Sequence, residues 1–294
     1  MTVAEHVFLA PYTTFHIGGP ADYFTSVGSQ NELIEAIQWA RQKGIQFFVL
    51  GTGANILVGD KGFRGLVIKN EARNIKVENN HVTAESGTTI AELINLTVQQ
   101  GLSGFEHFAG IPSSVGGALW QNLHFLSPDR VRTIFISEIL DTACIYSEQG
   151  ETQSVGKEFF KFGYDESILH YSKDVVLSAT FVLSSENTSI LNQRVAANIS
   201  WRQEKHPEHA TECSAGSVFK KIEGYGAGRL IEKVGLKGMQ IGAAKISEKH
   251  ANFILNTGKA TATDVRQLIS LVQEKVLGEL GLHLEKEISF VGEF

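Results

Sequence analysis

Residues 110–122, GIPSSVGGALWQN, are the stretch that decides the fold of this chain. They contain three glycines, two serines and one proline, and no charged side chain. They have neither the period of an amphipathic helix nor the alternation of a half-buried strand. Because glycine lacks a Cβ, it allows the backbone to approach another group closely. The stretch therefore predicts a loop held against a ligand, with a buried crossover of small residues as the alternative.

A second bare segment, FFVLGTGAN at 47–55, follows an apolar run that predicts a strand. Gly51 and Gly53 begin a dinucleotide-binding fingerprint, but Ile56 occupies the place of its third glycine and no helical pattern follows. This departure excludes a doubly wound dinucleotide-binding fold. Successive backbone N–H groups in such a turn still bind phosphate. Two such loops together favour a phosphate-containing ligand, and a tight strand-end turn is the alternative for the second one.

The composition is that of an ordinary globular protein. The chain has 294 residues, of which 43% are hydrophobic and 20% charged, enough for two or three domains. The formal net charge of -6 argues against a nucleic-acid partner. No apolar run reaches the length of a membrane span, and the N-terminus does not resemble a signal peptide. With only two cysteines, the sequence leads us to expect a cytoplasmic protein without a membrane partner.

Hydrophobic periodicity predicts mixed helices and strands. Apolar residues recur at helical spacing in three segments, and further apolar or alternating runs predict strands and a hairpin that turns at Asn79-Asn80. Since these elements do not alternate regularly, an α+β fold is predicted. The helices are expected over 31–44, 88–101 and 261–281, with another before Trp201, and the strands over 45–51, 65–70, 75–86 (the hairpin), 133–140, 141–150, 174–183 and 283–292.

Two polar residues in the last third are candidates for chemistry. Ser217 lies in CSAGSVFKK, close to two lysines whose positive potential would make its hydroxyl a better proton donor. Glu287 lies on the polar side of the last predicted strand. An ordinary surface loop and a solvated strand face are the alternatives. His206, His209 and Cys213 do not match a metal-ligand spacing, so no metal is predicted.

Seven segments in order carry a resemblance to one family. Together they cover nearly the whole chain, and the chain is similar to the shorter form of the UDP-N-acetylenolpyruvoylglucosamine reductases, flavoenzymes of peptidoglycan precursor synthesis. The segments are TTFHIGGPADYF (13–24), LGTGANILVGDKGFRGLVI (50–68), GIPSSVGGALWQN (110–122), FGYDES (162–167), CSAGSVFK (213–220), residues 227–261 and LEKEISFVG (284–292).

The resemblance implies a fold and a cofactor. It implies a two-part FAD-binding domain of the vanillyl-alcohol-oxidase (PCMH) type, 1–70 and 71–186, and a C-terminal α+β substrate-binding domain, 187–294. NADPH would be the reductant and a UDP-sugar the substrate, reduced to UDP-N-acetylmuramate. The two bare loops would bind FAD through Gly51, Thr52, Gly53, Ala54 and Asn55, and through Gly110, Ile111, Pro112, Ser113, Ser114, Gly116 and Gly117.

The resemblance also implies roles for residues outside these loops. Ser217 would donate the proton, and Glu287 would stabilise the enediolate that forms beside the substrate carboxylate. The substrate would be bound by Tyr164, Lys205 and Lys220.

Three departures from the family pattern bear on activity. Asp165 stands where the family has an arginine that pairs with the enolpyruvyl carboxylate, LHFLSPDR (123–130) replaces a glycine-rich run, and Lys221-Ile222 replaces Asn-Pro. The first exchanges a bidentate donor for an anion. Arg130, Arg132 and Arg202 are the candidates to compensate. The alternatives are a relative that binds FAD or nucleotide-sugar without turnover, and a flavin oxidoreductase of the same fold with another substrate.

Overall fold

The computed structural model describes residues 1–294 apart from 209, 210 and 223. Its contacts divide the chain into two compact units, each built from segments distant in sequence. We call them unit 1 and unit 2. The predicted domain boundaries after residues 70 and 186 stay a prediction. Unit 1 comprises Met1–Val3, Thr25–Thr52 and Val67–Arg202, and unit 2 comprises Ala4–Phe24, Gly53–Leu66 and Gln203–Phe294.

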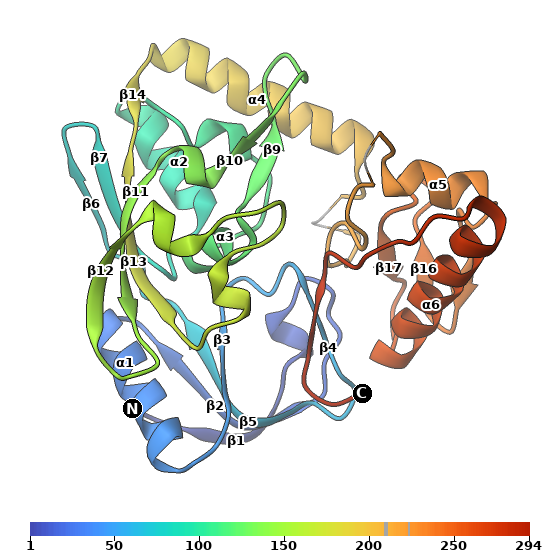
Figure 1. The fold of residues 1–294 in the computed structure, drawn as a ribbon, viewed down its shortest axis with the longest axis horizontal. Coiled ribbons are helices and arrows are strands. Elements are labelled where there is room, and N and C mark those ends of the chain that lie inside the picture. The colour runs from blue at the N-terminus through green and yellow to red at the C-terminus, as the bar shows by residue number, and fades with distance from the viewer. Residues whose placement is uncertain (209–210, 223) are drawn as a thin grey trace. The chain divides into compact units, whose positions relative to one another are not determined.

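A five-stranded antiparallel sheet forms the framework of unit 1 (Figure 1). The predicted hairpin is confirmed: Glu78 pairs with His81, and Asn79 takes the left-handed conformation that asparagine tolerates, with φ 57°. The strand order is β12-β11-β13-β7-β6, for β6 (Ile75–Glu78), β7 (His81–Glu85), β11 (Leu140–Tyr146), β12 (Thr152–Gly156) and β13 (Val175–Val182).

The helices of unit 1 begin at side-chain caps. Ser29 accepts a hydrogen bond from the Glu32 amide, and Thr89 forms a capping box with Glu92, so both predicted amphipathic helices are confirmed. Their apolar stripes are buried, and the second contributes to the main hydrophobic core of the unit. The helices are α1 (Gln30–Gln42), α2 (Ile90–Gln99), α3 (Val115–Gln121) and α4 (Thr188–Lys205), the last of which continues past the end of unit 1.

Shorter elements complete unit 1, and one corrects the sequence analysis. The predicted strand over 133–140 is wrong in its middle, where Ile136–Glu138 forms a 3-10 helix. The Glu138 carboxylate accepts a hydrogen bond from the Phe135 amide at 3.0 Å, which turns the chain there. The strands are β3 (Phe47–Leu50), β8 (Leu102–Ser103), β9 (His124–Leu126), β10 (Thr133–Phe135) and β14 (Ser184–Ser185), and the other 3-10 helices are Glu106–Phe108, Lys157–Phe160 and Ile168–His170.

Unit 2 packs α6 against a small antiparallel sheet, β15-β16-β17 (Figure 1). The predicted apolar stripe of α6 is confirmed, because Val265, Leu268 and Val272 are all buried, and the helix ends at Gly281 in the left-handed conformation. The elements are β1 (Ala4–Phe8), a 3-10 helix (Ala10–Tyr12), β4 (Ile56–Val58), α5 (Ala227–Lys233), β15 (Gln240–Ile241), β16 (Ala244–Ile246), β17 (Ile254–Asn256), α6 (Ala262–Leu280) and β18 (Ser289–Val291).

Two strands continue from one unit into the other along the chain. These are β2 (Pro20–Val27), whose first residues pair with β1 in unit 2, and β5 (Phe63–Asn70), whose last residues belong to unit 1. No helix among the described residues is long and apolar enough to cross a bilayer.

The last predicted strand is shorter than expected. Only Ser289–Val291 forms a regular strand, parallel to β4. The preceding residues instead bond irregularly to residues 218–220, through Lys220 N to Glu285 O and Glu287 N to Val218 O. This irregular pairing uses the backbone groups that a regular strand would need, while Leu284 and Ile288 remain buried as predicted.

Candidate functional site

Within unit 1, the start of the first bare loop (Gly51 and Thr52) lies against the second bare loop. The Thr52 hydroxyl donates a hydrogen bond to the Pro112 carbonyl oxygen at 3.1 Å, and the Lys69 ammonium group donates to the carbonyl oxygen of Gly51. Burial lowers the pKa of Lys69, although nearby Glu71 opposes the shift. This lysine places a cation beside the first loop and was not predicted from the sequence. The remaining residues of that loop, Gly53, Ala54 and Asn55, lie in unit 2.

Packing of the protein itself explains part of the need for glycine. A Cβ on Gly51 would collide with the Ser114 hydroxyl of the second loop. At Gly110 the backbone has φ 83°, and a Cβ would lie 3.0 Å from Cδ of Arg202. The bare backbone therefore lets the loops approach each other and lets the second loop approach α4, a reason that the sequence did not reveal.

Buried polar atoms beside the second loop fit a long polar ligand. The Thr88 hydroxyl oxygen and Asn122 Oδ1 are buried and have no hydrogen-bond partner among the described residues. Thr88 adjoins the loop, since its carbonyl oxygen accepts from the Val115 amide at 2.8 Å, and Asn122 ends α3. A bound molecule with polar groups along its length would satisfy these atoms, which otherwise lose hydrogen bonds on burial. The residues present thus fit FAD.

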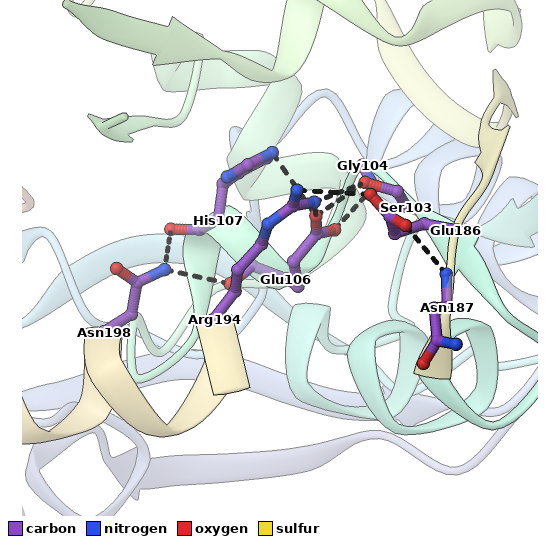
Figure 2. Close-up of polar contacts among 8 residues, drawn as sticks. All are labelled: Ser103, Gly104, Glu106, His107, Glu186, Asn187, Arg194 and Asn198. Carbon is purple, nitrogen blue, oxygen red and sulfur yellow. Dashed lines mark hydrogen bonds and ion pairs between the residues drawn. The ribbon is translucent and has the colours of Figure 1, made fainter. Parts of the chain in front are cut away.

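An ion pair between the buried Glu106 and the partly exposed Arg194 connects the entrance of the second loop to α4 (Figure 2). The fully buried carboxylate of Glu106 accepts hydrogen bonds from the Ser103 hydroxyl and the Gly104 amide, both at 2.6 Å, and from the Arg194 guanidinium at 3.1 Å. The Asn198 amide donates to the carbonyl oxygen of Glu106 at 3.2 Å. Burial by itself would raise the pKa of Glu106, but the hydrogen bonds from Ser103 and the Gly104 amide hold it below its usual value. The cluster holds α4 against residues 106–110.

Two of the altered family positions meet in unit 1. His124 Nδ1 lies 3.5 Å from Oδ1 of Asp165, and the rings of His124 and Tyr164 have their centroids 4.6 Å apart. Asp165 is buried and has φ 55°, in the left-handed region that aspartate tolerates. His124 was not among the residues predicted from the sequence. The signal was present, because a basic residue enters the altered 123–130 segment while an acidic residue replaces the arginine.

The three arginines proposed to compensate for Asp165 have other recorded contacts. Arg132 pairs with the Glu138 carboxylate at 3.0 Å on an exposed turn. Arg130 and Arg202 place their guanidinium carbons 5.5 and 5.4 Å from the centroid of the Phe125 ring, and burial lowers the pKa of Arg202 to about 10. Since neighbouring side chains in a strand point to opposite faces, Phe125 and His124 lie on opposite faces of β9. His124 is thus a basic residue that lies beside Asp165.

In unit 2, three predicted site residues, Ser217, Glu287 and Asn55, lie on segments that are hydrogen-bonded to one another. Ser217 forms a bridge with Phe253, and the following residue, Val218, accepts the amide of Glu287 at 2.8 Å. The Asn55 side chain donates to the Glu287 carbonyl oxygen at 3.3 Å. Ser217 and Glu287 are both partly buried. A hydroxyl and a carboxyl are thus carried on adjacent segments, although 70 positions separate them in sequence.

The predicted substrate lysines have carboxylate partners. Lys220 Nζ lies 2.7 Å from Glu285, and the exposed Lys205 lies 2.5 Å from Glu204. A phosphate would have to compete with these carboxylates for either lysine. Of the residues considered as metal ligands, His209 lies outside the described residues, and the described part of the chain has no cluster of three metal-ligating side chains.

Two family models match the chain and define the class of protein to which it belongs. Residues 21–131 match the family model of an FAD-binding domain, and residues 206–291 match that of the UDP-N-acetylenolpyruvoylglucosamine reductase C-terminal domain. The protein is thus an FAD-dependent oxidoreductase, and its α+β fold with an FAD-binding domain is as predicted.

Full-length relatives then give the family. The chain is 40% identical over 283 residues to the UDP-N-acetylenolpyruvoylglucosamine reductase of Caldanaerobacter subterraneus subsp. tengcongensis, covering 96% of this chain and 91% of the relative. It is 38% identical to that of Pediococcus pentosaceus, covering 99% and 95%. The crystal structure of the Thermus caldophilus enzyme (MurB) matches at a TM-score of 0.84 with 32% identity over 99% of each chain. The chain belongs to the UDP-N-acetylenolpyruvoylglucosamine reductase family, and this membership confirms the predicted resemblance.

Proposed function

We propose that this chain reduces UDP-N-acetylenolpyruvoylglucosamine to UDP-N-acetylmuramate with NADPH as the reductant. The reaction would serve peptidoglycan precursor synthesis in the cytoplasm. Family membership supports the substrate class and the cofactor. The single observation that carries the proposal in this chain is the pairing of the Ser217 and Glu287 segments through the Glu287 N to Val218 O hydrogen bond.

The chemistry needs a proton donor and a group that stabilises negative charge. When bound, FAD supplies the hydride that adds to the vinyl carbon of the substrate. The adjacent carbon then carries negative charge that spreads into the carboxylate. The Ser217 hydroxyl would donate the proton to that carbon, and the Glu287 carboxyl, when it is protonated or shares a cation, would stabilise the charge before the proton arrives.

Binding is divided between the loops and the last third of the chain. We assign FAD to the two bare loops, residues 51–55 and 110–117. Tyr164, Lys205 and Lys220 remain proposed substrate contacts. Exchange of the family's arginine for Asp165 favours a second candidate, a relative that binds FAD without reducing this substrate.

Rapid-mixing spectroscopy of the flavin tests the proposal. NADPH should bleach the flavin absorbance under anaerobic conditions, and UDP-N-acetylenolpyruvoylglucosamine should then restore it. Bleaching without recovery would contradict the proposed substrate and favour the second candidate.

A substitution at Ser217 tests its proposed role as the proton donor. Ser217→Ala should leave flavin reduction by NADPH unchanged and lower turnover by about 100-fold or more, because general-acid catalysis contributes factors of this size. Ser214→Ala, in the same segment, is the matched control and should retain turnover. A normal steady-state rate in Ser217→Ala would refute the assignment.

A further inference from the structure

We propose that His124, oriented by Asp165, is the group that binds the carboxylate of the enolpyruvyl substrate. The inference rests on the proposed function, because it assigns a contact to that substrate. Its starting point is the 3.5 Å approach of His124 Nδ1 to Asp165 Oδ1. The pair joins the 123–130 segment to the FGYDES segment, which lie far apart in sequence.

Only one member of the pair is accessible to a ligand. The Asp165 side chain is 1% exposed, whereas the His124 side chain is 16% exposed. A molecule that approaches this position therefore meets the imidazole before the carboxylate. Asp165 is a positioning residue in this arrangement, and His124 is the contact residue.

The surroundings fix the orientation of the ring. Nδ1 faces both Asp165 and the carbonyl oxygen of Asn122, which lies 3.4 Å away. The ring also packs against Tyr164 and against Phe135, its partner across the β9–β10 pair, with centroid separations of 4.6 and 5.3 Å. We assign Nε2, on the other side of the ring, to the ligand. A carboxylate that engages one imidazole nitrogen commonly sets the direction in which the other one points.

The charges suit an anionic ligand. A protonated imidazole donates from both nitrogens. The substrate has a carboxylate on its enolpyruvyl group, and an imidazolium donor to a carboxylate is a charge-assisted hydrogen bond. An arginine would offer a permanent charge and two parallel donors. The His124–Asp165 pair instead offers one directed donor whose own counter-charge is buried behind it.

Kinetics with two substrate-like molecules test the assignment. His124→Leu should raise the KM for UDP-N-acetylenolpyruvoylglucosamine by about 10- to 100-fold, the range for loss of a hydrogen bond to a charged group. The same variant should bind UDP-N-acetylglucosamine, which lacks the enolpyruvyl carboxylate, as tightly as the unchanged protein. The rate of flavin reduction by NADPH should not change.

Further variants separate contact from positioning. His124→Gln, which keeps a side-chain donor, should lose less than His124→Leu. Asp165→Asn as a single substitution should raise the KM. Added to His124→Leu it should have no further effect, because Asp165 acts through the histidine. Arg132→Ala, an exposed residue paired with Glu138, is the control and should leave KM unchanged. Flavin content and melting temperature show whether each variant folds.

The possible outcomes have distinct meanings. If the reduced flavin of the unchanged protein is not reoxidised by the enolpyruvyl substrate, the proposed function fails. If it turns over and His124→Leu keeps its KM within twofold, the proposed function stands and this inference is overturned. Equal weakening of UDP-N-acetylglucosamine binding, or an equal effect of Asp165→Asn in both backgrounds, would also overturn it.

Discussion

Glu106 and Asp165 are two buried carboxylates of unit 1 whose cationic partners differ in kind. Glu106 faces Arg194, which is always charged, and also accepts hydrogen bonds from Ser103 and Gly104 (Figure 2). Asp165 faces His124, whose charge depends on its protonation and whose ring is partly exposed. A buried pair with a permanent charge and fixed donors suits a structural connection. A buried carboxylate behind an exposed imidazole suits contact with a ligand.

The largest stability difference is expected at the structural pair. Glu106→Ala should lower the free energy of unfolding by about 2 kcal/mol or more, because it leaves the buried Gly104 amide without its acceptor and removes one of the two carboxylates that pair with Arg194. The double variant Glu106→Leu/Arg194→Met should lose less than the single one. Urea unfolding of the FAD-loaded protein measures both. A loss below about 1 kcal/mol in Glu106→Ala would remove the distinction between the two carboxylates.

Asp165→Asn should have the smaller structural effect. The substitution keeps the side-chain volume, and it weakens one ion-pair contact, the 3.5 Å approach of His124, so about 1 kcal/mol of stability should be lost. The same urea titration measures it. A loss as large as that of Glu106→Ala would mean that the Asp165–His124 pair is a structural connection too.

The pH dependence of stability concerns His107 beside Glu106. Burial lowers the pKa of His107, so between the usual histidine pKa, about 6.5, and the lowered value the unfolded chain binds more protons than the folded one. Stability should therefore fall as the pH drops below about 6.5, by about 1.4 kcal/mol for each unit of the depression.

His107→Gln provides the control for this effect. The variant should flatten that part of the curve in thermal unfolding between pH 8 and pH 5, while His250, whose pKa burial also lowers, continues to contribute from unit 2. An unchanged slope in His107→Gln would assign the dependence to other groups.

Local sequence signals predicted much of the fold because they depend on neighbours in the chain. The apolar stripe of α6, the cap at Thr261 and the turn at Asn79 each follow from residue type and spacing. The predictions failed where distant segments compete for backbone groups. Residues 284–287 bond to residues 218–220 instead of forming a regular strand, and no local pattern shows this.

In the candidate site, too, local sequence signals were predictive and contacts between distant segments were not. The bare loops and the Ser217 segment were found from composition and family resemblance. Lys69 and His124 were not found, because a lone lysine in a strand has no distinguishing spacing, and a basic residue in the altered 123–130 segment does not show by itself what it faces. Their importance comes from what they face, the Gly51 carbonyl oxygen and the Asp165 carboxylate.

The sequence by itself determined the family, the helices with strong periodicity and the two glycine-rich loops, since each of these is written in residue order. Only the tertiary structure decided that Ser114 fills the space beside Gly51 and that the two exchanged positions, His124 and Asp165, meet. The physical reason is that such contacts join residues separated by tens of positions, and side-chain packing and charge pairing act through space, independently of order along the chain.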